Sequence, residues 1–189
     1  MIDDSVPWRN ELHRISKRLT QKKTQKRWVD RSFFLVERDL MIGFFALRRL
    51  IEAEKTSSLL PERRLVVGVL PLTGRGPLHL DRWTPWEFYD FESKQRSELN
   101  VGSLLQEVIH SFVLTLAFDE DGVLSGVYVG SDRTKGKRLY LVDMQNIIEL
   151  FDFVSREDMV WWSWHRINGS DQASYRLSQH DVLDGLFVL

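Results

Sequence analysis

The chain contains no cysteine among its 189 residues. It therefore has no disulfide framework, no thiolate nucleophile, and no site in which cysteine would hold zinc or an iron–sulfur cluster. The longest apolar run spans residues 40–47, whereas a membrane-spanning helix needs about 20 residues. Asp3 and Asp4 stand where a secretory signal peptide would carry basic residues. We therefore expect a cytoplasmic protein.

Motifs for catalysis and cofactor binding are also missing. The five histidines include no pair spaced i, i+4 and no His-x-His, so the sequence offers no recognisable metal site. A serine nucleophile in a Gly-x-Ser-x-Gly turn is absent as well. Residues 73–77 form a Gly-rich turn after an apolar run, but they lack the Lys-Ser/Thr ending of a phosphate-binding loop. We expect no metal and no cofactor, and the sequence favours a protein that is not an enzyme.

The residues that are present are typical of an ordinary globular protein. Hydrophobic residues make up 43% of the chain and aromatic residues 12%, which is enough to build a core. The length of 189 residues is close to that of one domain. We expect a single domain over residues 1–189, with a helical N-terminal region over 1–60 and a sheet-containing body over 61–189.

Two amphipathic helices are predicted in the N-terminal region. The first has apolar residues at steps of 4, 3 and 4: Trp8, Leu12, Ile15 and Leu19. The second begins near Asp30 and has apolar residues at similar steps: Phe33, Val36, Leu40, Phe44, Leu47 and Ile51. Three further apolar residues widen this side to most of the circumference: Met41, Ile42 and Phe45. We therefore expect the second helix to be covered on nearly all sides.

Short strands are predicted to cluster in the body rather than to alternate with helices. Residues 65–70 form a branched apolar run that is typical of a buried strand. Residues 112–118 and 123–130 alternate around an acidic turn, which predicts a β-hairpin, and residues 138–142 add a third antiparallel strand. The fold class that follows is α+β, with the N-terminal helical pair packed on a mostly antiparallel sheet.

The rest of the body is predicted to hold two short helices and a terminal hairpin. Helices begin at Ser103 and after the capping residue Asp143. Residues 159–167 and 173–177 form the hairpin. Residues 83–91 are aromatic and contain a proline, and we expect an edge strand or a packed loop there.

Charge is distributed unevenly along the chain. Residues 1–64 hold 15 basic and 9 acidic side chains, a net charge of +6, whereas residues 65–189 hold 11 and 18, a net charge of −7. Seven cations with no acid among them, here called the basic segment, lie within residues 14–27: Arg14, Lys17, Arg18, Lys22, Lys23, Lys26 and Arg27. We expect them to contact nucleic acid or an acidic partner, or to form a solvated helix face. A further alternative is that the acidic body of the same chain or of a second copy attracts them.

Three residues have the chemistry of a metal-dependent nuclease. Asp81 and Glu92 could hold Mg²⁺, and Lys94 could stabilise charge on an attacked phosphate if it shared a strand face with Glu92. This spacing also arises by chance in many sequences. The three residues are therefore catalytic candidates without a supporting motif.

Tryptophan is concentrated in two short segments. Five of the seven tryptophans lie within residues 83–86 and 161–164. Trp162 and Trp164 share one face of the predicted strand, and Trp161 lies on the other. These rings could fill the core of a small sheet, stack on bases, or form an oligomer or partner surface.

The sequence favours a non-enzymatic cytoplasmic binding module that acts through a protein partner or by self-association. The second hypothesis is a nucleic-acid-binding protein that contacts phosphates through the basic segment. The third hypothesis is a Mg²⁺-dependent nuclease.

Overall fold

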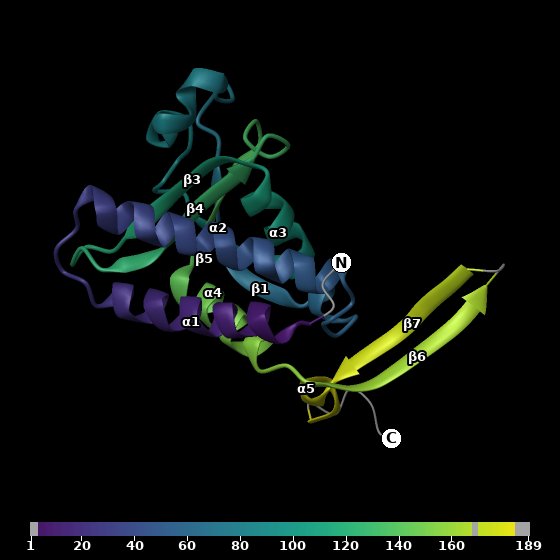
Figure 1. The fold of residues 1–189 in the computed structure, drawn as a ribbon. Coiled ribbons are helices and arrows are strands. Elements are labelled where there is room, and N and C mark those ends of the chain that lie inside the picture. Colours follow the sequence, from purple (N-terminus) through teal and green to yellow (C-terminus); the bar gives the residue numbers. More distant parts are fainter. Residues whose placement is uncertain (1–3, 168–169, 184–189) are drawn as a thin grey trace.

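The computed structural model describes residues 4–167 and 170–183, with the backbone alone for residues 160–167, 170–175 and 182–183. The helices are α1 (Val6–Lys23), α2 (Asp30–Glu52), α3 (Val101–Ile109), α4 (Met144–Ser155) and α5 (Gln179–Leu183). The strands are β1 (Arg64–Pro71), β2 (Gln95–Asn100), β3 (Ser111–Phe118), β4 (Leu124–Ser131), β5 (Arg138–Asp143), β6 (Met159–Ile167) and β7 (Ser170–Ser178). Short 3₁₀ turns are η1 (Leu60–Glu62), η2 (His79–Trp83) and η3 (Pro85–Glu87). The predicted α+β class is confirmed (Figure 1).

Within the described residues, five strands form one sheet in the order β2-β1-β5-β4-β3, and every neighbouring pair is antiparallel. The meander of β3, β4 and β5 agrees with the prediction. After β2 at one edge of the sheet, α3 carries the chain to β3 at the opposite edge. The side chain of Asp143 accepts the Gln145 N–H at 2.7 Å and so caps α4, as predicted.

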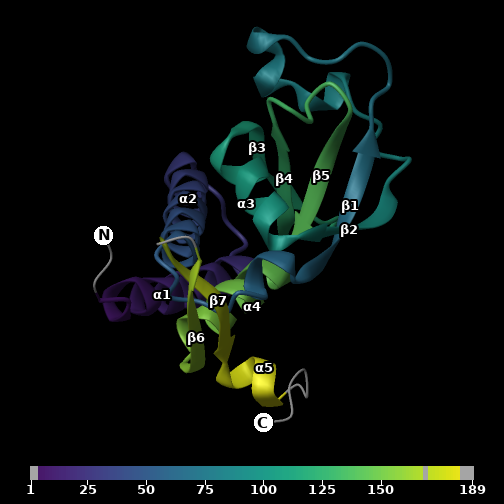
Figure 2. The same cartoon turned by 90° about the vertical axis from the view of Figure 1, so that its right-hand side faces the viewer.

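Helices α1, α2, α3 and α4 gather on one side of this sheet (Figures 1 and 2). The main core contains apolar side chains of all four longer helices together with those of the central strands. Leu12 and Ile15 of α1 are fully buried, and Phe44 of α2 packs edge-on against Phe151 of α4 at 5.1 Å between ring centroids. Burial of such side chains is the dominant stabilising contribution to a fold of this size.

The other side of the sheet has a smaller core of its own. Its buried members are Leu70, Phe88, Tyr89, Phe112, Val113 and Leu139. Phe88 and Tyr89 reach the sheet from the long segment between β1 and β2. This segment, residues 72–94, is here called the lobe, and its 3₁₀ turns lie at the top of Figure 1.

Of the two alternatives for residues 83–91, the structure has the packed loop: 3₁₀ turns and a single bridge from Leu72 to Tyr89, with Phe88 and Tyr89 buried. Two other features differ from expectation. Strand β2 was not predicted, because its residues are polar and mostly exposed at the sheet edge. Helix α2 buries one side only.

Strands β6 and β7 pair with each other and extend away from the sheet (Figure 1). The predicted terminal hairpin is therefore confirmed. It is attached to the body where the Ser58 N–H donates to the Arg176 carbonyl at 3.0 Å and the Arg176 guanidinium meets Glu54 at 3.1 Å. Among the described helices, none has the length and apolar character that a membrane crossing requires.

Candidate interaction surfaces

Four large apolar side chains stand out of the lobe into solvent. Leu78 and Leu80 are 62% and 85% exposed, and Trp83 and Trp86 are 76% and 64% exposed. Single exposed apolar residues are common on protein surfaces, whereas a cluster of this kind on one short segment is a candidate contact site. The lobe is therefore the first candidate surface.

The backbone of the lobe is held by contacts at its base. The Thr73 N–H donates to the Phe88 carbonyl at 3.0 Å, and the Asp81 carboxylate accepts the Leu78 N–H at 2.8 Å. The Tyr89 hydroxyl donates to the Lys135 carbonyl at 2.7 Å. Burial raises the pKa of Tyr89 to about 12, so this hydroxyl keeps its proton at physiological pH.

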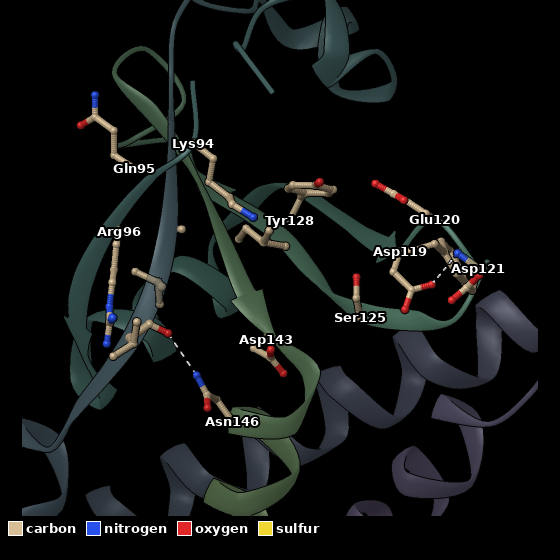
Figure 3. Close-up of a pocket in the computed structure, with 15 residues that line it drawn as sticks. Lys94, Gln95, Arg96, Asp119, Glu120, Asp121, Ser125, Tyr128, Asp143 and Asn146 are labelled. Carbon is tan, nitrogen blue, oxygen red and sulfur yellow. Dashed lines mark hydrogen bonds between the residues drawn. The ribbon is translucent and has the colours of Figure 1, made fainter. Parts of the chain in front are cut away.

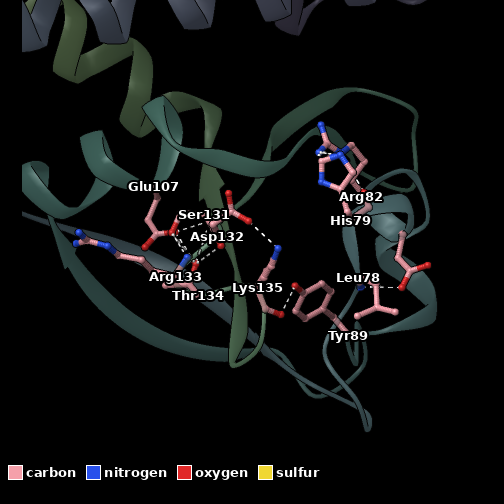
Figure 4. A network of polar contacts seen from close by, with 11 residues as sticks. Leu78, His79, Arg82, Tyr89, Glu107, Ser131, Asp132, Arg133, Thr134 and Lys135 are labelled. Carbon is pink, nitrogen blue, oxygen red and sulfur yellow. Dashed lines mark hydrogen bonds and ion pairs between the residues drawn. The ribbon is translucent and has the colours of Figure 1, made fainter.

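The turn that receives Tyr89 is itself fixed from α3 (Figure 4). The buried Glu107 carboxylate accepts the Ser131 N–H at 2.7 Å and the Thr134 hydroxyl at 2.6 Å. The Lys135 ammonium lies 4.1 Å from the Phe112 ring centroid and 2.6 Å from Asp132. The lobe is thus tied through this turn to the main body, and its exposed side chains are presented on an ordered backbone.

A second apolar surface runs along α2. Phe34, Met41 and Phe45 are 60%, 39% and 50% exposed, and they lie on one side of the helix because they are spaced by 7 and 4 residues. We call these three residues the α2 stripe. Ile42 at its margin is 38% exposed, and Trp8 of α1 lies 6.3 Å from Phe45 between ring centroids.

A groove of about 860 Å³ lies on the side of the sheet away from the helices. Lys94 and Arg96 line it at one side, and the acidic β3–β4 turn lies at the other (Figure 3). A Cβ at Gly68 would lie 3.0 Å from Lys94 Cδ. The aliphatic part of the Lys94 side chain therefore packs closely over β1. The Asp119 carboxylate already has local partners, since it accepts the N–H groups of Asp121 and Val123.

The basic segment does not form a uniform row of unpaired cations. Arg18 donates to both carboxylate oxygens of Asp39, at 2.8 and 3.1 Å, and to Glu11 at 3.0 Å. Hydrogen bonding to Asp39 raises the pKa of Arg18. Arg14 also lies 3.6 Å from Glu11. The Lys22 ammonium donates to the side-chain oxygen of Gln25, and the Lys23 ammonium donates to that of Gln145. The other three cations are exposed: Lys17, Lys26 and Arg27.

Alanine substitutions should distinguish a cation of the basic segment that stabilises the fold, Arg18, from one that is only solvated, Lys26. Asp39 is only 4% exposed at its side chain, and without Arg18 it keeps Arg38 at 2.9 Å as its ion-pair partner. We expect Arg18→Ala to lower the free energy of unfolding by about 1 to 2 kcal/mol, a value reduced by the partial exposure of Arg18. Lys26→Ala should change it by less than about 0.5 kcal/mol. Urea denaturation measures both, and equal effects would contradict a structural role for Arg18.

The three nuclease candidates have different surroundings. The Asp81 carboxylate accepts the Leu78 N–H within the lobe, and the Arg75 guanidinium lies 3.9 Å from it. Glu92 is exposed, and Lys94 lines the groove. No group of three metal-ligating side chains occurs in the part of the chain that the structure describes. Trp161, Trp162 and Trp164 lie on β6, where the backbone alone is described.

Sequence reasoning singled out Trp83 and Trp86 but not Leu78 and Leu80. A usable signal was the irregular spacing of these apolar residues, by 2, 3 and 3 positions in residues 78–86, which fits neither a helix nor a strand face. Sequence reasoning also gave no role to Glu157.

Glu157 lies at the centre of a buried polar cluster where α4 ends. Its side chain is fully buried, Oε1 accepts the Ser57 N–H at 3.1 Å, and Oε2 has no hydrogen-bond partner among the described residues. Arg9 donates to the carbonyls of Glu157, Val154 and Lys55. Burial raises the pKa of Glu157 to about 7, against the lowering effects of the Ser57 N–H, of Arg9 and of the nearby Ser178 hydroxyl, which itself donates to Asp181 at 3.0 Å. Asp181 raises the pKa of Glu157 further.

Comparisons with models of protein families, with curated proteins and with solved structures found no match. Function is therefore argued from the surfaces themselves.

Proposed function

We propose that this protein is an interaction module that docks to a partner protein through the lobe. The observation that carries the proposal is the exposure of Trp83 and Leu80, 76% and 85%, on a backbone held by buried contacts. Tryptophan is enriched among the residues that contribute most to protein interfaces. An ordered backbone lowers the entropic cost of binding.

Charge around the lobe favours a protein as the ligand over an anionic membrane or nucleic acid. Both signs of charge lie among the exposed apolar side chains: Asp81 and Glu87 are acidic, Arg82 is basic, and Arg75 lies 3.9 Å from Asp81. Phosphate groups would meet these carboxylates with repulsion. A protein can offer an apolar pocket with both signs of charge at its rim, as non-obligate interfaces commonly do.

The test compares a lobe variant with a matched surface variant. A partner captured by crosslinking is first purified and shown to bind the purified protein in isothermal titration calorimetry. Leu80→Ser combined with Trp83→Ser should then raise the dissociation constant about 100-fold or more. Val29→Ser is the control, because Val29 is 61% exposed at the start of α2, outside the lobe. It should bind as the wild type does.

Other outcomes would overturn the proposal. Equal affinity of the lobe variant and the wild type would exclude the lobe as the docking surface. Binding to anionic vesicles that depends on Trp83 would indicate a membrane ligand. Salt-dependent binding of labelled RNA or DNA that disappears when Lys17, Lys26 and Arg27 are neutralised would favour the nucleic-acid hypothesis.

A further inference from the structure

We infer that a cavity between η1, the end of α4 and α5 binds a small organic cation, that is, a primary ammonium group on an apolar body. The cavity has a volume of about 400 Å³, which is within the range of pockets that hold small molecules. The lobe lies at the top of Figures 1 and 2, and α5 lies at the bottom of both. The inference therefore concerns another part of the molecule and does not depend on the proposed function.

Carboxyl groups outnumber cations at this cavity. Glu62, Glu157 and Asp181 line it, and Arg63 is the only cation among the lining residues that the structure describes. Arg63 is exposed, and its guanidinium lies over the Phe153 ring, 4.2 Å from the ring centroid. This balance of charge favours a cationic ligand over an anionic one.

One of these carboxyl groups is buried and lacks a hydrogen bond. Glu157 is fully buried, and its Oε2 has no partner among the described residues. The nearby Ser178 hydroxyl has a single proton, which it donates to Asp181 at 3.0 Å. A buried acceptor without a donor is unfavourable, and an ammonium group would supply the donor. The terminal torsion of glutamate is broad, so a small rotation of the carboxyl group turns Oε2 toward an incoming ligand.

The rest of the lining is apolar, which indicates the kind of cation. Leu59, Leu60 and Phe153 line the cavity beside the carboxyl groups. A divalent metal ion prefers a shell of oxygen ligands and water, and the described part of the chain has no cluster of side chains that could hold a metal ion. Apolar walls instead favour a hydrocarbon group. An alkyl or aryl ammonium combines the two features.

Isothermal titration calorimetry of the full chain with phenethylammonium at pH 8 tests the site. An amine of this kind is protonated at pH 8. Phenethyl alcohol is the matched probe, because it has the same apolar body without the charge. We expect the ammonium to bind about tenfold more tightly than the alcohol, since only the ammonium forms a charge-assisted hydrogen bond.

A substitution at the buried carboxyl group tests which residue recognises the ammonium. Glu157→Gln keeps an oxygen for the Ser57 N–H but cannot carry a negative charge. We expect it to raise the dissociation constant of phenethylammonium about tenfold or more at pH 8 and to leave that of phenethyl alcohol unchanged. Circular dichroism should confirm that the variant is folded.

The pH provides a second readout of the same interaction. Burial raises the pKa of Glu157 to about 7, so the carboxyl group is mostly protonated at pH 5. We expect phenethylammonium to bind about tenfold or more weakly at pH 5 than at pH 8. Other charged or titratable groups lie around this carboxyl group: Arg9, Glu62, Arg63, Asp158, His180 and Asp181. If one of them caused the pH dependence, Glu157→Gln would retain it.

Removing the cation at the rim should have the opposite effect on affinity. We expect Arg63→Gln to bind phenethylammonium about threefold more tightly, because it removes a charge of the same sign as the ligand. Arg64→Gln is the control. Arg64 is next in sequence, is 73% exposed at its side chain and lies 3.1 Å from Glu98 rather than at the cavity. It should bind the probe as the wild type does.

Three results would overturn the inference. Absence of phenethylammonium binding at millimolar concentrations excludes this class of ligand. Equal affinity for the ammonium and the alcohol shows that the carboxyl groups do not recognise the charge. Binding that Glu157→Gln leaves unchanged in strength and in pH dependence shows that the ammonium binds elsewhere.

Discussion

The free energy of unfolding should decrease as the pH rises from about 5 to 8, and Glu157→Gln should remove most of this decrease. The cause is the burial of a carboxyl group that is fully inaccessible to solvent and has one oxygen without a partner among the described residues. Burial raises its pKa from an ordinary value of 4.5 to about 7. The folded protein therefore holds this proton more tightly than the unfolded chain does.

The direction of the effect follows from proton binding in the two states. Below pH 4.5 both states hold the proton, and its contribution to stability is fully present. Between the two pKa values the unfolded chain ionises while the folded protein stays protonated, so raising the pH favours unfolding. Above about pH 7 both states are ionised and the contribution is lost. Over this pH range the free energy of unfolding should fall by a total on the order of 3 kcal/mol.

Urea denaturation at several pH values between 5 and 8 measures this change. Glutamine keeps an oxygen for the Ser57 N–H but does not ionise, so Glu157→Gln should be more stable than the wild type at pH 8. Glu92→Gln is the matched control, because Glu92 is exposed in the lobe. Its stability should follow the wild-type pH dependence. Parallel curves for Glu157→Gln and the wild type would show that this carboxyl group does not cause the dependence.

The parts of the fold that the sequence predicts are those with a local pattern. The apolar steps from Trp8 to Leu19 and from Phe33 to Ile51 depend only on helix geometry, and helices occur at both places. The hairpin of β3 and β4 depends on alternation and on turn residues close in sequence. The position of β1 beside β5 joins residues such as Val67 and Val142, which no local pattern relates.

The candidate surfaces were only partly predictable, for a physical reason. An apolar residue such as Leu80 has the same sequence signature whether it is buried or exposed, and exposure is decided by what packs over it. Arg18 likewise looks like its neighbour Lys17, but only Arg18 reaches the buried Asp39. Glu157 stands between charged residues in the sequence, and its burial depends on contacts with Arg9 and Ser57, far away along the chain.

The close packing of α2 against α4 depends on the absence of a side chain at Gly43. We expect Gly43→Val to lower the free energy of unfolding by about 3 kcal/mol. A Cβ at this position would lie 2.4 Å from Cε2 and 2.6 Å from Cζ of Phe151. That ring is fully buried and packs against Phe44 at 5.1 Å between centroids, so it has no free space to enter. A valine would force α2 and α4 apart.

A second substitution distinguishes this steric cause from a general effect of glycine replacement. Gly43→Val combined with Phe151→Leu should recover part of the loss, because the smaller side chain makes room for the new methyl groups. Gly74→Val is the control, since no atom lies within 4 Å of a Cβ there, and it should change stability by less than about 0.5 kcal/mol. If Phe151→Leu only adds its own loss to that of Gly43→Val, the close contact of the two helices at Gly43 is not the cause. If it compensates, Gly43 fixes the depth at which α2 lies on the core.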